Sequence, residues 1–248
     1  MRLAFEKGFG FNQHPALACA QSIDDNKVIY TLGKQILLYD MLTEVQKVID
    51  NFGQDEEVSC FKYFKNIMLD DNILYALAAP SKTYPILVLK NFSKGNNNRY
   101  VLSHLEKDET VIGLELVNDF KYIAVLSELQ DAQRFSLIDT FTKEVHCSET
   151  LYFSVRGILA PYSNDKVSIL YGDNEMYLVQ LGQEVKPSPL NFSEVLNIEN
   201  EQIVEVVSAL QNEPNFYLIT NKGNLYFISL NLSHNKVRRW KKQFLGTY

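Results

Sequence analysis

Residues 34–47 read KQILLYDMLTEVQK, and two structures compete for this stretch. Its apolar residues recur at spacings of three and four, which would line one face of a helix. The alternative is two strands, residues 35–39 and 44–49, joined by a turn over 40–43. Periodicity alone cannot decide over so short an apolar run, so the answer has to come from repetition elsewhere in the chain.

The stretch belongs to a repeat with a period of about fifty residues. LYDMLTEV at 38–45 resembles LIDTFTKEV at 137–145, which we align with Lys143 as one extra residue. ILVLKNF at 86–92 is the intermediate copy, and runs at 176–183 and 225–231 follow. The residues that punctuate these runs lie 43 to 51 positions apart: Asp40, Asn91, Asp139, Gly182 and Asn231. A period in this range, with strand-sized apolar runs inside it, is typical of propeller blades.

The intermediate copy excludes the helix. It continues as NFSKGNNNR at 91–99, and Gly95 with three consecutive asparagines is unfavourable inside a helix. Asp, Asn and Gly share the punctuating positions because they tolerate tight turns, where a short polar side chain bonds the nearby backbone. We therefore predict two strands across 34–47.

Each period contains four strand-sized runs, and the fourth run is the most polar. We predict an all-β fold with about five four-stranded blades, in a β-propeller ring that we expect to be incomplete or irregular. The predicted domain spans 13–248 after a leading strand in 1–12. Its blades lie at approximately 13–53, 54–106, 107–150, 151–198 and 199–248.

The first blade carries a more specific pattern. IDDNKVIY at 23–30, followed by Gly33, Tyr39-Asp40, Gln46-Lys47 and Ile49, resembles the opening blade of the cilia- and flagella-associated WD-repeat proteins. The resemblance covers residues 3–50, and the remainder resembles a degenerate WD40-like propeller. The chain departs from the pattern because it contains no Gly-His and no Trp-Asp dipeptide. Family members usually have two propellers, whereas this sequence stops near a fifth blade.

The resemblance implies a structural component of the ciliary axoneme, in the cytoplasm and cytoskeleton. It implies a place in a large hetero-complex bound to doublet microtubules or dynein-associated complexes, with axonemal proteins and tubulin as partners. The rival hypothesis is a propeller subunit of a cytosolic coat, tethering or nuclear-pore assembly, which the repeat fits equally well. A second rival, an enzyme that uses the central channel, requires titratable residues on the innermost strands, but the runs expected there are largely apolar.

Composition narrows the function classes. The 248 residues carry a net charge of −6, which is unsuited to tracking a phosphate backbone, so we expect no nucleic-acid partner. We expect no signal peptide and no membrane span, because the sequence contains no run of 18 apolar residues. The three cysteines are far apart and odd in number, which predicts reduced thiols. The three N-x-S sequons are expected to be chance matches.

No motif in the sequence predicts catalysis or a metal site. Of the four histidines, only His146 adjoins another candidate ligand, Cys147, and neighbouring strand residues point to opposite faces. The paired acids fall in predicted loops, where turn formation is the simpler explanation: Asp24-Asp25, Glu56-Glu57 and Asp70-Asp71. No P-loop, G-x-S-x-G or G-x-G-x-x-G motif occurs. We predict a non-enzymatic protein without a cofactor or metal.

The one segment with a binding chemistry is KVRRWKKQF at 236–244. The predicted partner-binding residues, which we call the basic strip, surround the single tryptophan: Lys236, Arg238, Arg239, Trp240, Lys241 and Lys242. Arg and Trp are frequent interface anchors, so the strip could dock an acidic protein surface such as a tubulin tail. The competing interpretation is an outer strand whose charges protect a sheet edge. The acidic openings of the periods, such as EKDE at 106–109, are expected to lie on a rim and keep the protein soluble.

Overall fold

The computed structural model describes residues 20–52, 58–65, 73–79, 84–91, 97–117, 121–130, 132–152, 154–159, 167–172, 176–180, 187–190, 201–208, 215–233 and 236–247. Every regular element of these residues is a β-strand, and none of them forms a helix long and apolar enough to cross a membrane. The leading strand predicted in 1–12 lies outside the described residues.

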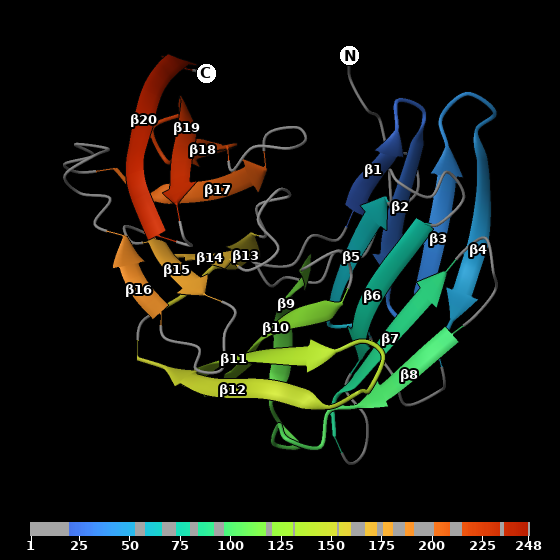
Figure 1. The fold of residues 1–248 in the computed structure, drawn as a ribbon. Helices are drawn as coiled ribbons and strands as arrows, with labels where there is room; N and C mark the ends of the chain where they lie inside the picture. The colour runs from blue at the N-terminus through green and yellow to red at the C-terminus, as the bar shows by residue number, and fades with distance from the viewer. Residues whose placement is uncertain are drawn as a thin grey trace. The chain divides into compact units, whose positions relative to one another are not determined.

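The described strands form five antiparallel sheets of four strands each, and every sheet follows the chain in order (Figure 1). The first sheet contains β1 (Ala20–Asp24), β2 (Lys27–Leu32), β3 (Gln35–Asp40) and β4 (Val45–Asn51). The second contains β5 (Cys60–Lys65), β6 (Ile73–Ala79), β7 (Ile86–Asn91) and β8 (Asn97–Val101). The third contains β9 (Thr110–Val117), β10 (Tyr122–Leu129), β11 (Ala132–Asp139) and β12 (Val145–Leu151).

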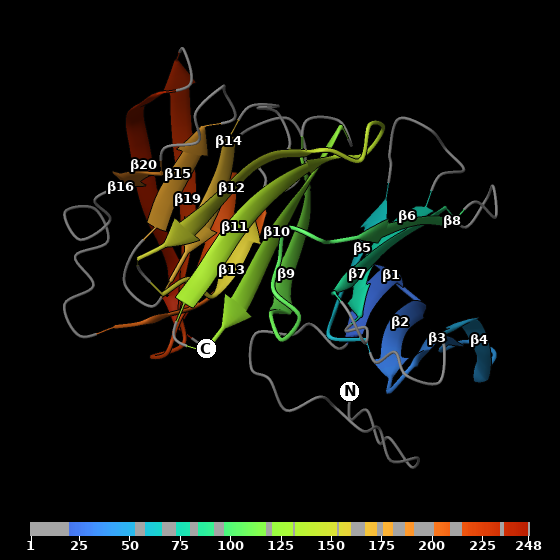
Figure 2. The same cartoon turned by 90° about the horizontal axis from the view of Figure 1, so that it is seen from below.

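The fourth sheet contains β13 (Gly157–Leu159), β14 (Val167–Tyr171), β15 (Met176–Gln180) and β16 (Pro187–Leu190). The fifth contains β17 (Ile203–Ser208), β18 (Asn215–Thr220), β19 (Asn224–Ser233) and β20 (Lys236–Thr247). Figure 2 shows the four strands of the third sheet side by side. We call the five sheets blades 1 to 5. The all-β fold of four-stranded blades predicted from the repeat is confirmed.

Residues 34–47 are two strands, as predicted. β3 and β4 pair in antiparallel register, with Leu38 opposite Lys47 and Asp40 opposite Val45. A helix over these residues is therefore excluded, because the backbone groups of β3 and β4 form hydrogen bonds between the two strands.

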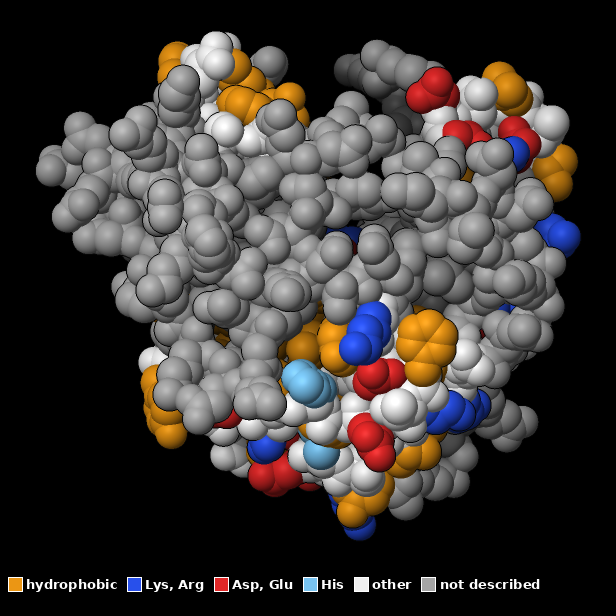
Figure 3. All heavy atoms as spheres, viewed as in Figure 1, with side chains coloured by type: hydrophobic (Ala, Val, Ile, Leu, Met, Phe, Trp, Pro, Cys, Tyr) orange, Lys and Arg blue, Asp and Glu red, His pale blue; other side chains and the backbone are white. Residues whose placement is uncertain are grey.

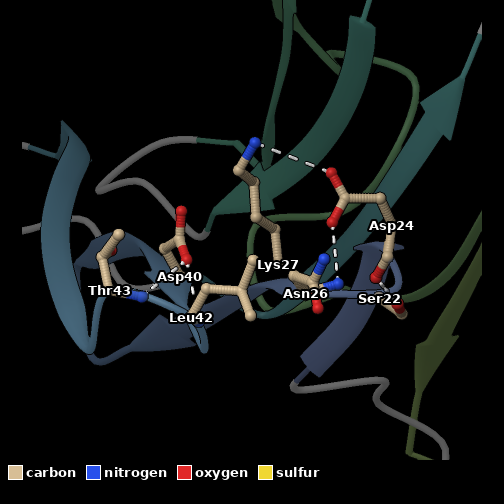
Figure 4. A network of polar contacts seen from close by, with 7 residues as sticks. All are labelled: Ser22, Asp24, Asn26, Lys27, Asp40, Leu42 and Thr43. Carbon is tan, nitrogen blue, oxygen red and sulfur yellow. Dashed lines mark hydrogen bonds and ion pairs between the residues drawn. The ribbon is translucent and has the colours of Figure 1, made fainter.

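A carboxylate closes the turn between these strands. Asp40 Oδ1 accepts hydrogen bonds from the backbone nitrogens of Leu42 (2.9 Å) and Thr43 (3.1 Å), as Figure 4 shows. The equivalent turn in blade 3 repeats this arrangement, because Asp139 Oδ1 accepts from Phe141 and Thr142 at 2.8 and 2.9 Å. Bonds from Thr43 and Thr142 stabilise the charged carboxylates, so the pKa of each aspartate lies below its ordinary value.

The alignment of Lys143 as an extra residue was wrong. Lys143 (φ 65°) occupies the same left-handed turn position as Glu44 (φ 56°), so the two turns have equal length. Neither copy has an additional residue in its outer strand. In β12 Leu137 pairs with Cys147 but Ile138 pairs with Val145, and in β4 Ile36 pairs with Asp50 but Leu37 pairs with Val48. A β-bulge in each strand therefore accommodates one unpaired residue, His146 in β12 and Ile49 in β4.

The chain divides into two compact units, residues 1–114 with 127–130 and residues 115–126 with 131–248, and blade 3 contributes to both. The assignment of 13–248 to one propeller domain, and the form of its ring, stay predictions. Within the first unit, an apolar cluster joins blades 1 and 2. Ile29 and Ile36 of blade 1 pack with buried residues of blade 2 and its approach, among them Val58, Phe61 and Val88.

The middle blades are buried on both faces of their sheets. Successive residues of β10 from Ile123 to Leu126 are at most 1% exposed, and those of β7 from Ile86 to Leu89 are at most 9% exposed. A strand alternates its side chains between the two faces, so both sheet faces must be covered. This pattern predicts continuous apolar runs in the sequence, which β7 and β10 contain.

Leu137 and Leu38 each stand two residues before the turn aspartate of their blade, but only Leu137 is fully buried (0% exposed), whereas Leu38 is half-buried. We predict that Leu137→Ala lowers the free energy of unfolding by about 2–5 kcal/mol, because it removes buried methyl groups and leaves a cavity. Leu38→Ala is the matched comparison and should lose less. Urea denaturation measures both, and a loss near zero for Leu137→Ala would place this residue outside a core.

Candidate protein-interaction surface

The basic strip lies on β20, the outer strand of blade 5 (Figure 1). β20 pairs with β19 along its length, from Ser233 opposite Lys236 to Asn224 opposite Thr247. This confirms the predicted outer strand. The side chains of the six predicted partner-binding residues lie outside the described part of the structure, so their role in binding stays a prediction.

The described end of β20 is apolar and exposed. Phe244 is 53% exposed and Leu245 is 44% exposed, and only Gln243 separates them from the basic strip in the sequence. The ring of Phe244 lies 5.5 Å from that of Tyr226 on β19, which holds it on the sheet. Figure 3 shows hydrophobic side chains grouped over the C-terminal end of β20. The charges of this strand are visible in the sequence, whereas the exposure of the apolar pair near its end is not.

Polar side chains tie blade 1 to blade 2. Gln21 on β1 accepts a hydrogen bond from the backbone nitrogen of Tyr63 on β5 at 2.6 Å. Lys90 Nζ on β7 forms a 2.8 Å ion pair with Asp50 Oδ2 on β4, and both side chains are largely shielded from solvent. Each bond joins a side chain of one sheet to its neighbour, so the two blades are fixed in register and not only stacked.

Blades 3 and 4 are joined by a glutamine that binds both backbone groups of one residue. Gln133 Oε1 accepts from Val155 N at 2.7 Å, and Gln133 Nε2 donates to Val155 O at 3.0 Å. Blades 4 and 5 are joined by Tyr171 Oη, which donates to Glu205 Oε1 at 2.8 Å. Burial raises the pKa of Tyr171 far above its ordinary value, so the phenol remains a donor.

Tyr171 also explains the glycine opposite it. The Tyr171 ring lies where a Cβ at Gly157 would have to sit, and Gly157 pairs with Tyr171 across β13 and β14. Any larger residue at 157 would force the Tyr171 ring to shift from this position.

The acidic opening at 106–109 is exposed at Glu106, Lys107 and Asp108, as predicted, but not at Glu109. Glu109 is 3% exposed, accepts a 2.5 Å hydrogen bond from Ser127 Oγ, and accepts another from Glu106 N at 2.9 Å. Its carboxylate therefore organises the approach to β9. In a second opening, Glu201 is half-buried and accepts from Asn224 Nδ2 at 2.9 Å.

The other titratable candidates do not converge on one point. His146 is exposed and its ring lies 5.3 Å from that of Tyr122, whereas burial raises the pKa of the Cys147 thiol to about 11. Asp24 accepts from Asn26 N at 2.9 Å in the β1–β2 turn, which is turn chemistry (Figure 4). Among the residues that the structure describes, no three His, Cys, Asp or Glu side chains are placed to hold a metal ion.

The acid pairs Glu56-Glu57 and Asp70-Asp71, with His14 and His234, lie outside the described residues. The described residues therefore form hydrogen bonds between neighbouring blades and leave part of the outer strands exposed to solvent. Gln21 and Gln133, which bridge neighbouring blades, were not predicted from the sequence. The sequence feature that marks them is an amide side chain inside a strand-sized apolar run.

We predict that Gln133→Leu destabilises the protein by about 1–3 kcal/mol, because the amide and carbonyl of Val155 lose their partner in a shielded position. The matched control is Gln46→Leu on the exposed strand β4, which should change stability by no more than about 0.5 kcal/mol. Thermal and urea unfolding measure both variants. Equal stability of the two would show that the glutamine bridge contributes nothing.

Comparison with known proteins supports the fold alone. No family model and no curated protein matches the sequence. Among solved structures, the β-propeller domain of Cps50 (Swd1) from Myceliophteria thermophila is similar, with a TM-score of 0.54 and 14% identity over 87% of this chain and 68% of that domain. A chain of the mitotic checkpoint complex gives a TM-score of 0.53 and 8% identity, over 90% of this chain and 79% of the other. The chain therefore has a β-propeller fold.

Proposed function

We propose that this protein is a non-enzymatic scaffold that binds other proteins through the strands and faces of its blades. The observation that carries the proposal is the combination of side-chain bonds between neighbouring blades with exposed apolar residues at the end of β20. Bonds between blades fix the relative positions of their surfaces, and a pre-organised surface loses less entropy when a partner binds. The similar structures include a protein complex, which is consistent with protein partners.

The finer proposal is a structural component of the ciliary axoneme, bound to doublet microtubules or dynein-associated complexes. Its support is the resemblance of residues 3–50 to the cilia- and flagella-associated WD-repeat proteins. The alternative is a propeller subunit of a coat, tethering or nuclear-pore assembly, and the similarity to a chain of the mitotic checkpoint complex favours a multi-subunit assembly of this general kind. In either case the basic strip on β20 is the proposed contact with an acidic protein surface.

Charge reversal on the strip tests both the function and the site. In a ciliated cell, the tagged chain should remain with demembranated axonemes, and Lys241→Glu with Lys242→Glu should release most of it because the acidic partner is then repelled. The matched control is Lys34→Glu with Lys107→Glu, which reverses two exposed lysines outside the strip. All three proteins should unfold at nearly the same temperature.

The outcomes separate the alternatives. Recovery of the wild-type chain with coat or nuclear-pore proteins, and not with axonemes, would favour the second assignment. Retention of the strip variant at moderate salt would show that β20 only protects a sheet edge.

A further inference from the structure

One face of blade 5 is exposed although it is apolar. On β18, Phe216, Leu218 and Thr220 are at most 2% exposed, while the alternate residues Tyr217 and Ile219 are each 38% exposed. Both faces of this strand carry large apolar side chains. The two faces therefore differ in whether another part of the molecule covers them.

Neighbouring strands extend the exposed face. Val207 on β17 lies opposite Tyr217 and is 49% exposed, and Phe227 on β19 lies opposite Tyr217 from the other side. The rings of Tyr217 and Phe227 are 5.4 Å apart. We call these residues the open face: Val207, Tyr217, Ile219 and Phe227. A contiguous apolar patch of this kind marks an interaction site more often than a single exposed residue does.

The repeat shows which face this is. Asn231 does not end its strand as predicted, because β19 continues to Ser233. The first residues of β2 and β18 pair with Asp40 and Ser229, so Tyr217 and Phe227 are equivalent to Ile29 and Leu38. Ile29 is 0% exposed, whereas Tyr217 is 38% exposed. In blade 1 this position packs on the next sheet, since Ile29 lies in one cluster with Val88 and Ile86 of blade 2. The open face is therefore the face that a following blade covers.

The open face fits the opposite face of another sheet, and it does not fit the open face of a second copy of this chain. Val88 and Ile86 stand three and five residues before Asn91, so the packing of blade 2 on blade 1 joins unlike faces of the repeat. A second copy of the chain would offer its own open face, which is the like face. Its unlike face on blade 1 carries Leu37, three residues before Asp40, and Leu37 is already buried (1% exposed).

One carboxylate borders the open face. Glu205 lies opposite Ile219 and is exposed, and its Oε1 accepts from Tyr171 Oη and from its neighbour Val206 N at 3.2 Å. A partner sheet must leave this carboxylate solvated, while the apolar side chains of the open face pack as two stacked sheets do.

We propose that the open face docks an apolar β-sheet of a partner protein, which stacks on blade 5 as a sixth blade. This proposal rests on the scaffold function and adds a second surface to the basic strip. The partner presents an uncovered sheet with β-branched and aromatic residues at alternate positions, and it needs no basic patch.

The test uses the tagged full chain in its native complex. Tyr217→Lys and Ile219→Lys place a charge on the open face, and Val101→Lys is the control at an exposed apolar residue of blade 2 (57% exposed). The proposal predicts that each open-face variant recovers about tenfold less partner per chain than wild type, as expected at an interface centre, while Val101→Lys is unchanged. Thermal unfolding confirms that the variants fold.

A photo-crosslinking phenylalanine analogue at position 217 gives a second measurement that needs no destabilising change. The proposal predicts adducts at alternate residues of a strand in a different protein, lost when Ile219→Lys is combined with it. Adducts to a second copy of this chain, to a helix or loop of a partner, or to nothing would overturn it. If Tyr217→Lys retains its complex while reversal of Lys241 and Lys242 dissolves it, the open-face proposal fails and the scaffold function stands; a wild-type chain that carries no partner at all contradicts both.

Discussion

A four-stranded sheet with apolar side chains on both faces cannot be stable alone, and this constraint governs the molecule. Each blade must be covered on two sides, so blades have to stack, and Ile29 and Ile36 of blade 1 show the contact by packing with Phe61 and Val88 of blade 2. The fully buried run of β10 shows the same requirement met on both faces. Where the cover is missing, as on β18, an apolar face is left exposed. Both the stability of the fold and its capacity to bind follow from the same surfaces.

Apolar stacking alone would leave neighbouring sheets free to slide, and polar bonds prevent this. The glutamine bridge from Gln133 to the backbone of Val155 and the bond from Tyr171 to Glu205 each fix one sheet against the next. Hydrogen bonds are directional, unlike apolar contacts. They therefore fix the relative position of two sheets, while apolar burial holds the sheets together. A scaffold needs both, because its partners recognise surfaces that several blades hold in place.

The fold could be predicted from the sequence because residues in the turns themselves mark the ends of strands. Asp40 and Asp139 close their turns with their own carboxylates, so the same residue type marks the end of the third strand in blades 1 and 3. Asn231 was a misleading marker, because β19 runs past it to Ser233. The pairing within a blade follows from the order of strands along the chain. The bulges at Ile49 and His146 could not be predicted, since a bulged residue looks the same in the sequence as a paired one.

The surfaces were harder to predict than the strands. Glu109 looked like a solvated acid, but its carboxylate is buried against Ser127, a contact that depends on two segments meeting in space. The basic strip was found because charge is visible in a sequence, whereas the open face was not, because an exposed Tyr217 and a buried Phe216 are equally apolar. Whether an apolar side chain is exposed depends on how the blades pack on one another, and no local sequence pattern indicates it.

The stacking of unlike sheet faces is most directly tested by methyl–aromatic nuclear Overhauser effects in the selectively labelled chain. The structure predicts cross-peaks between the methyl groups of Ile36 and the ring of Phe61, which belong to different sheets but to one cluster. Cross-peaks confined to pairs within a single sheet would contradict the stacked arrangement, and with it the surfaces proposed for binding.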